Sequence, residues 1–214
     1  MKQNYQLLLD KQLTQLQESG IVPRLLLHSC CAPCSSYVLE YLSRYFDITV
    51  YYYNPNISPR EEFLRRAEEQ QRLIEQMPLS RPVNCLIGAY DPASFSAIAA
   101  GLENEPEGGA RCTACYRLRL ESTARSAAEG GYDFFTTTLS ISPLKDAERL
   151  NAIGGELAEL VGVPYLYSDF KKKEGYKRSC QLSTEYELYR QDYCGCAFSK
   201  RDAQLRKNKK TDGK

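Results

Sequence analysis

The sequence predicts an α/β fold with a parallel sheet, because short apolar runs alternate with segments of helical periodicity. Five runs are rich in leucine, β-branched or aromatic residues and are bounded by turn-forming residues; they span 24–29, 48–53, 82–87, 133–139 and 164–167. Strands that alternate with helices in this way form a sheet whose two faces are both covered by helices.

The helical segments are predicted from the spacing of their apolar residues. A leucine stripe at 7, 8, 9, 13 and 16 predicts a helix over 5–17. Ser58 is the expected N-cap of a helix that runs to about residue 76, with Pro59 as its first residue. Further helices are expected at 34–46, 91–100, 115–128, 146–161 and 185–193.

The chain is expected to form a single domain over 1–214, since 214 residues are enough for one substantial core. Within it we expect an α/β core at 24–169, a helical appendage at 170–200 and a basic tail at 201–214. The residues from 171 onward carry 13 Lys or Arg and 6 Asp or Glu, a net charge of +7, whereas the preceding residues have a net charge of −6. A basic end on an acidic body indicates a polyanionic partner, although 206–214 alone is typical of a solvated tail.

Composition excludes several classes of protein. Apolar residues make up 43% and charged residues 26%, so the chain is not disordered as a whole. No apolar run approaches the ~20 residues of a membrane span, and residues 1–20 lack the apolar region of a secretory signal. We therefore expect a cytoplasmic protein with no membrane partner, in which structural disulfides are not expected.

Seven of the nine cysteines fall in three tight clusters, which is the main chemical signal of the sequence. Cys30 and Cys31 directly follow the first strand, at the sheet edge where ligands of α/β proteins bind, and Cys112 and Cys115 form a Cys-x-x-Cys before a helix. Clustered thiols in a reducing compartment are typical of metal ligands. Four such thiolates suit an iron–sulfur cluster or, less well at this spacing, a zinc ion.

The third cluster, Cys194-Gly195-Cys196, predicts a different chemistry. Two cysteines separated by a glycine can close a small, strained and easily cycled disulfide ring, which favours two-electron redox chemistry. The alternative is a second pair of metal ligands. Of the two isolated cysteines, Cys85 is expected to be core packing.

Taken together, the motifs resemble the epoxyqueuosine reductase QueH family over about residues 24–199. The resemblance is carried by His-Ser-Cys-Cys-Ala-Pro-Cys at 28–34, Tyr-Asn-Pro-Asn-Ile at 53–57, Cys-x-x-Cys-Tyr-x-x-Arg at 112–119, Thr-Thr-Thr-Leu-Ser-Ile-Ser-Pro-x-Lys at 136–145 and Cys-Gly-Cys-x-Phe-Ser at 194–199. It implies a fold similar to the adenine-nucleotide alpha-hydrolase (HUP-like) domains. It also implies reduction of the epoxide of epoxyqueuosine at the tRNA wobble position, without cobalamin.

The same resemblance implies the roles of six cysteines. Cys30, Cys31, Cys112 and Cys115 would hold a [4Fe-4S] cluster, and Cys194 with Cys196 would be a redox-active disulfide. An external donor would supply the electrons. The partner would be a tRNA with epoxyqueuosine in its anticodon, and a basic stretch is the expected site for its phosphates: Lys171, Lys172, Lys173, Lys177 and Arg178.

Several residues remain as catalytic or second-metal candidates. Cys34 lies near a helix N-terminus that favours its thiolate, and it could be a thiol donor, a ligand of an additional iron or other metal, or packing. His28 is a candidate acid, but a supporting or core role is favoured for it. A carboxylate could complete a second metal site, and the candidates are Asp91, Asp146 and Asp169.

Two other functions compete with this interpretation. A cluster-dependent tRNA thiolation enzyme would carry a glycine-rich phosphate loop after the first strand, but this chain has Ser-Cys-Cys-Ala-Pro-Cys there. A zinc-stabilised RNA-binding module would contain zinc in place of iron and sulfide.

Overall fold

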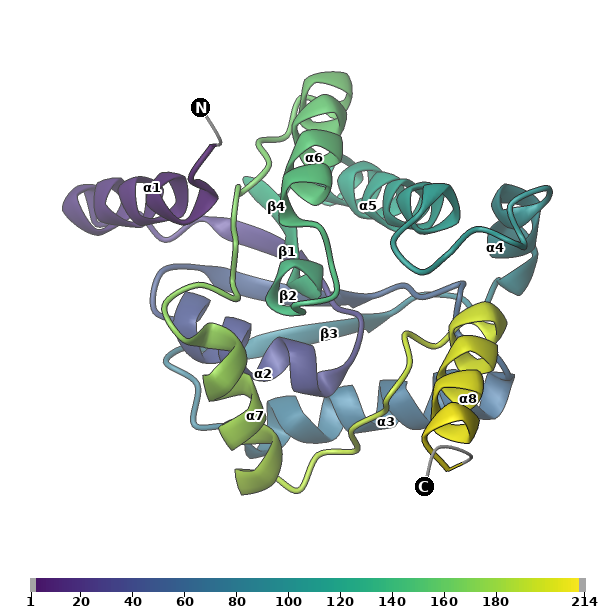
Figure 1. Cartoon of the computed structure of the whole chain (residues 1–214). Helices are drawn as coiled ribbons and strands as arrows, with labels where there is room; N and C mark the ends of the chain where they lie inside the picture. Colours follow the sequence, from purple (N-terminus) through teal and green to yellow (C-terminus); the bar gives the residue numbers. More distant parts are fainter. Residues whose placement is uncertain (1–2, 212–214) are drawn as a thin grey trace.

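The computed structural model describes residues 3–211 and contains, within them, a four-stranded sheet in the order β3-β2-β1-β4 (Figure 1). All three pairings are parallel, which confirms the predicted fold class. The strands are β1 Arg24–His28, β2 Asp47–Tyr52, β3 Val83–Ile87 and β4 Phe134–Thr137.

The predicted fifth strand at 164–167 is wrong. Only Tyr165 pairs with the sheet, through an isolated bridge to Phe135. Pro164 has no N–H to donate, and the Leu166 carbonyl accepts a hydrogen bond from the Thr136 hydroxyl at 2.8 Å. The segment therefore runs along β4 without extending the ladder.

Helices cover both faces of the sheet, as Figure 1 shows. Within the described residues they are α1 Tyr5–Ser19, α2 Ala32–Leu42, α3 Arg60–Gln76, α4 Pro92–Ala99, α5 Ala110–Glu129, α6 Ala147–Val161, α7 Gly175–Glu185 and α8 Ala197–Thr211, with a 3-10 helix, η1, at Thr138–Ile141. None of these helices combines the length and the apolar character that crossing a membrane requires.

Alternating side chains of β1 bind the two helical layers to the sheet. Leu25 and Leu27 are fully buried in a core with α1 and α2, whereas Leu26 is buried on the opposite face with α5 and α6. Burial of one leucine side chain contributes about 1.5–3 kcal/mol. This two-sided burial fixes β1 at the centre of the sheet and leaves its carboxyl end open to the loops that follow.

The C-terminal region differs from prediction. Residues 185–193 are not helical beyond Glu185, because Glu187 adopts a φ of 48°. The helix of this region instead precedes the segment, as α7, and packs against α2. The basic tail is also helical as far as Thr211, since α8 buries Ala203; residues 212–214 of the tail lie outside the described part.

Candidate metal and redox site

The loops that follow β1 and β4 meet at the carboxyl edge of the sheet. The register of the two strands places His28 beside Thr137, so the residues that follow each strand are also neighbours. The Cys30 amide donates to the Thr138 hydroxyl oxygen at 3.3 Å, and that hydroxyl lies 3.6 Å from the Cys30 sulfur. The first cysteine cluster is therefore anchored to the central strands.

Three cysteines of this loop form a compact group. Cys30 and Cys31 have their sulfurs 3.8 Å apart, and the sulfur of Cys34 joins them so that all three lie within 4.8 Å of one another. The turn into α2 produces this grouping, because Cys31 is its N-cap and Cys34 lies in its first turn. Three thiols at this separation could hold a metal ion.

The second cluster lies inside a helix. The sequence predicted a helix start at residue 115, but α5 begins at Ala110, so Cys112 and Cys115 both belong to it. The Cys112 sulfur accepts a hydrogen bond from the Gly108 amide at 3.2 Å. Within the described residues, neither thiol joins the compact group, so the four predicted cluster ligands are not assembled as one set of sulfurs.

The third cluster connects these two groups. Cys194 lines a cavity of about 400 Å³ together with Cys30, Cys31 and Cys34. It also lines a neighbouring space of about 20 Å³, in which Cys112, Cys115 and Cys196 are found. All nine cysteines are free thiols.

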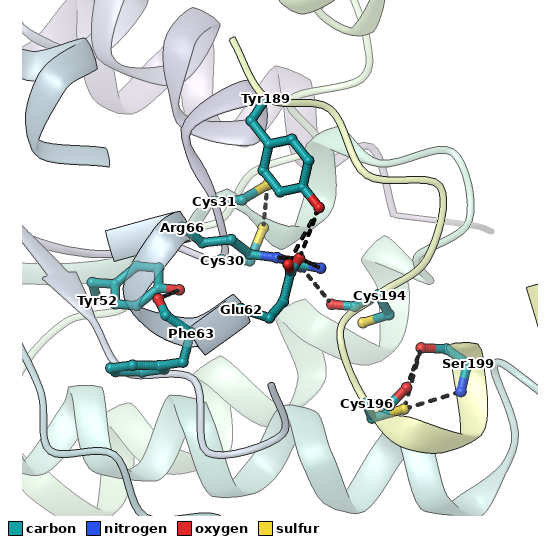
Figure 2. A network of polar contacts seen from close by, with 10 residues as sticks. All are labelled: Cys30, Cys31, Tyr52, Glu62, Phe63, Arg66, Tyr189, Cys194, Cys196 and Ser199. Atoms are coloured by element: carbon teal, nitrogen blue, oxygen red, sulfur yellow. Dashed lines mark hydrogen bonds and ion pairs between the residues drawn. The ribbon is translucent and has the colours of Figure 1, made fainter. Parts of the chain in front are cut away.

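A segment that we call the arm, residues 186–196, carries Cys194 across the site. It joins α7 to α8 and lies along α3 (Figure 1). Figure 2 shows Arg66 of α3 at the centre of this contact: its Nη1 donates to the Cys194 carbonyl at 3.2 Å and its Nε donates to Glu62 at 2.7 Å. The Tyr189 hydroxyl donates to the same carboxylate at 3.2 Å.

Cys196 ends the arm and begins α8. Its sulfur accepts a hydrogen bond from the Ser199 amide at 3.3 Å, in the way that an oxygen usually caps a helix. Lys200 donates its amide to the Cys196 carbonyl at 3.0 Å. The helix start thus fixes one thiol of the pair, while the other faces the larger cavity.

Four buried cations surround these cysteines, and among the described residues two of them form an ion pair with an acid. Arg66 pairs with Glu62, and Lys145, whose Nζ is 3.3 Å from Glu107, lines both cavities. Arg111 and Arg119 are 2% and 1% exposed, and each has a buried guanidinium nitrogen without a partner. A surplus of buried positive charge is costly unless anions lie beside it. Thiolates, alone or around a metal centre of net negative charge, meet that requirement, so the residues present are suited to such a group.

The thiols of the compact group have unequal acidity. The pKa of Cys30 is lowered well below its usual value, chiefly by hydrogen bonds from Cys31 and Cys34. The pKa of Cys34 is raised, because its own proton is held in the bonds to Cys30 and Cys31. Within the group the hydrogen bonds therefore favour a thiolate at Cys30 over one at Cys34.

His28 is unsuited to donate a proton. It is fully buried, and burial followed by the nearby Arg119 cation lowers its pKa to about 3. Its Nε2 lies 3.3 Å from Nε of Arg119 and 3.2 Å from the Tyr53 carbonyl oxygen, and its Nδ1 lies 2.8 Å from the Thr137 hydroxyl. The ring is a buried, neutral neighbour of the guanidinium, in keeping with the supporting or core role that the sequence favours.

The three candidate carboxylates have other partners. Asp91 and Asp146 are the N-caps of α4 and α6, where they accept from the amides of Ser94 and Arg149. Asp169 pairs with Lys171 at 2.8 Å. Among the described residues, no carboxylate belongs to the compact cysteine group.

The basic stretch is largely paired with acids on the protein itself. Ion pairs join Lys171 to Asp169, Lys173 to Asp10, Lys177 to Glu174 and Arg178 to Glu40. Lys171 and Lys172 also line a surface cavity of about 630 Å³ near the start of α6. This cavity adjoins the larger cysteine cavity, since Lys145 lines both.

The buried cations were not among the functional residues predicted from the sequence. The spacing of the second motif contained a signal for one of them, because Arg119 follows Cys115 by one helical turn and so lies on the same face of α5. Arg66 had no such signal, since its contact with Cys194 joins residues 128 positions apart.

Comparison with known proteins places most of the chain in one family. A family model described as "Epoxyqueuosine reductase QueH" matches residues 25–202. Proteins named epoxyqueuosine reductase QueH from Staphylococcus epidermidis and Streptococcus pyogenes are 45% and 41% identical to it; each alignment covers 92% of this chain, and 85% and 78% of the respective relative. A protein of that name from Thermotoga maritima is 33% identical over 81% of this chain and 88% of its own length. The chain belongs to the epoxyqueuosine reductase QueH family.

Proposed function

We propose that this protein is an epoxyqueuosine reductase that acts on tRNA in the cytoplasm, depends on an iron–sulfur cluster and uses no cobalamin. The observation that carries the proposal is the convergence of three cysteine clusters on one edge of the sheet, among four buried cations of which only two form ion pairs within the described residues. Family membership supports the oxidoreductase activity and the substrate.

The reaction takes up two electrons and two protons, breaks both carbon–oxygen bonds of the epoxide and releases its oxygen as water. A cluster bound by the cysteines would supply electrons one at a time. An external donor must replace these electrons after each turnover. The protein's own task is to bind the modified base against the cysteine edge, exclude water and stabilise the charge that develops on the departing oxygen.

The cavity beside the compact cysteine group is suited to that task. Its volume of about 400 Å³ lies in the usual range for sites that take a small molecule or a base. Lys145 and Arg66 contribute positive charge to its wall, and a buried cation stabilises developing negative charge far better than water does. The Cys194 thiol lines the same cavity and can exchange electrons with Cys196 through a disulfide.

We propose Cys30, Cys31, Cys112 and Cys115 as the ligands of the [4Fe-4S] cluster, with Cys34 as a further metal ligand. The proximity of Cys34 to Cys30 and Cys31 favours a ligand role for it over packing. Ligation by Cys34 and one neighbour of an additional iron or other metal would leave the cluster with an iron open to substrate.

The first test is anaerobic reconstitution, followed by incubation with tRNA that contains epoxyqueuosine and a reductant, with no cobalamin added. We expect iron and sulfide in equal amounts and conversion to queuosine in the digested tRNA. Cys30→Ala should lose iron and turnover together, and Cys34→Ser should lose iron in excess of four per chain. Bound zinc without iron would indicate the RNA-binding module, and ATP-dependent thiolation would indicate the other alternative.

The proposed redox pair is tested by Cys194→Ser combined with Cys196→Ser. Because neither residue is a proposed cluster ligand, this variant should keep the iron content of the wild type. It should complete at most one turnover, since the pair would no longer relay electrons. Loss of iron from the variant would instead assign both residues as metal ligands.

A further inference from the structure

Arg119 is a buried cation whose two hydrogen-bond partners are neutral side chains. It is 1% exposed, although its neighbours on α5, Arg117 and Arg125, are exposed and pair with glutamates. None of the ion pairs among the described residues includes Arg119. Its Nη2 donates to the Asn54 amide oxygen at 2.5 Å and its Nε donates to His28 at 3.3 Å, and both of these acceptors are neutral.

The remaining nitrogen of the guanidinium makes no hydrogen bond, although the Arg119 side chain and the Cys115 thiol interact. Nη1 of Arg119 is buried and makes no hydrogen bond. A buried charge that is left uncompensated costs several kcal/mol, and an unmade hydrogen bond adds to that cost. The fold therefore holds a donor and a full positive charge ready for an anion.

The groups that can supply this anion are thiols from two different cysteine clusters. Arg119 lies one helical turn beyond Cys115; burial raises the pKa of that thiol to about 12, and Arg119 is the strongest influence that opposes the rise. The same guanidinium contributes to the lowered pKa of Cys30, after the hydrogen bonds from Cys31 and Cys34. The Arg119 side chain thus extends from α5, which carries Cys115, toward the loop after β1, which carries Cys30.

The orientation of the Arg119 guanidinium is fixed by its hydrogen bonds to Asn54 and His28. Asn54 donates its own amide to the Ser29 carbonyl at 2.9 Å, so its oxygen must face Arg119. His28 is held by the Thr137 hydroxyl and the Tyr53 carbonyl and stays neutral, with its Nε2 3.3 Å from Nε of Arg119. With two nitrogens bound to these supports, the planar guanidinium can present only Nη1 to the cysteine edge.

We propose that Arg119 is a positioning residue that donates a hydrogen bond from Nη1 to an anionic sulfur of the group held by Cys30 and Cys115, and that its fixed charge raises the reduction potential of that group. The inference rests on the proposed function, since it requires a redox-active group at these cysteines. A positive charge beside a centre stabilises the state that has gained an electron, and hydrogen bonds to cluster sulfurs act in the same direction.

The test measures iron content and midpoint potential in the reconstituted protein, by anaerobic titration of the visible absorbance. Arg119→Gln removes the charge, Arg119→Lys keeps it, and Asn54→Asp leaves the guanidinium in place but gives it an acidic partner. Thr123→Val is the matched control, because Thr123 is fully buried one turn further along α5 and bonds only to the Arg119 carbonyl.

We expect Arg119→Gln and Asn54→Asp to shift the one-electron equilibrium at least tenfold toward the oxidised form, a potential about 59 mV more negative. Arg119→Lys and Thr123→Val should remain near the wild-type potential. If Arg119→Gln does not retain iron, Asn54→Asp decides, because it preserves the guanidinium.

Wild-type potentials in both charge-altering variants would overturn the inference, as would a lysine variant that behaves like the glutamine variant. Loss of iron from both, with the control intact, would also overturn it and make Arg119 a purely structural residue. A wild-type protein that binds no iron would contradict the proposed function together with this inference, whereas iron at an unchanged potential contradicts the inference alone.

Discussion

Gly195 separates the two thiols of the proposed redox pair and occupies a position that no other residue suits. Its φ is +121°, and a Cβ atom there would lie 2.9 Å from Ile57 and 3.1 Å from Nη1 of Arg66. The Gly195 carbonyl accepts from the Ser58 amide at 3.0 Å, which ties the turn to the start of α3. The glycine lets the chain reverse against a buried arginine, so that Cys194 and Cys196 both line the smaller cavity while Cys194 also lines the larger one.

Gly195→Ala should therefore destabilise the protein by about 1–3 kcal/mol, because it adds backbone strain and a clash at one point. Urea unfolding measures this loss. Gly162→Ala is the control: its φ is +74°, but nothing lies within 4 Å of the added carbon, so only a strain of about 1 kcal/mol is expected. Equal losses in the two variants would mean that the contact with Arg66 is unimportant.

At the scale of elements, helix α3 holds the arm along much of its length. The Glu69 carboxylate accepts from the Tyr189 amide at 2.7 Å and from Arg72, and Arg72 in turn donates to the carbonyls of Tyr186 and Glu187. Arg65 stacks over the Tyr189 ring at 3.5 Å. These contacts satisfy backbone hydrogen-bonding groups of the arm that a helix would have satisfied internally.

Glu69→Gln should loosen the arm, because it removes the charge from two of these hydrogen bonds. Hydrogen exchange of residues 186–190 at pH 7 should become about tenfold faster, the equivalent of 1.4 kcal/mol of local stability. Glu68→Gln, an exposed neighbour on the same helix, is the matched control and should leave exchange unchanged. Unaltered exchange in the Glu69 variant would show that Arg65 and Arg66 alone hold the arm.

Acid should have the same effect on the wild type. The bond from Arg72 lowers the pKa of Glu69 below its usual 4.5, so the folded arm binds fewer protons than the free one. Its stabilisation is present above about pH 4.5 and is lost as the pH falls through the lowered pKa. After correction for intrinsic rates, exchange in the arm should rise in acid in the wild type but change less in Glu69→Gln.

Sequence periodicity predicted the elements that bury an apolar stripe and failed for those fixed by polar contacts. α3 and α6 agree with prediction to within a residue or two, since each buries one regular face. A helix was predicted over 185–193. The prediction failed because nothing in that segment reveals that Arg72, 115 positions away from Glu187, donates hydrogen bonds to its carbonyls. The early start of α5 was missed because the glycine-rich loop before it masks the first turn.

At the scale of the whole molecule, the sequence predicted which cysteines cluster but not how the clusters combine. Parallel strands deliver Cys30 and its neighbours to one edge, as the strand order requires. The entry of Cys34 into the compact group depends on the exact turn into α2, and the position of Cys194 between two cavities depends on the path of the arm. Spacing along the chain contains neither piece of information.

In the folded chain, most cations of the basic stretch are paired with acids of the same protein. Four of the five cations proposed to meet tRNA form ion pairs with acids of the protein, while Lys172 forms none among the described residues. Exposed ion pairs of this kind contribute about 0–1 kcal/mol, so a phosphate can replace the acid at little cost. The pairs therefore do not prevent a tRNA contact, and of the paired cations Lys171 lines the cavity near α6.

Replacement of Lys171, Lys172 and Lys173 by Ala should weaken tRNA binding and flatten its dependence on salt. Each phosphate contact that is lost lowers the slope of log affinity against log salt by about 0.7–0.9, so the triple variant should lose up to about 2–3 in slope. Filter binding between 50 and 300 mM salt measures it. The control removes three exposed cations elsewhere, Lys11, Arg44 and Arg81, and should change the slope much less. Truncation after Lys207 should also have little effect, because the end of α8 is proposed to be solvated. If the two triple variants lost the same slope, the effect would come from overall charge, and the basic stretch would not be the contact surface.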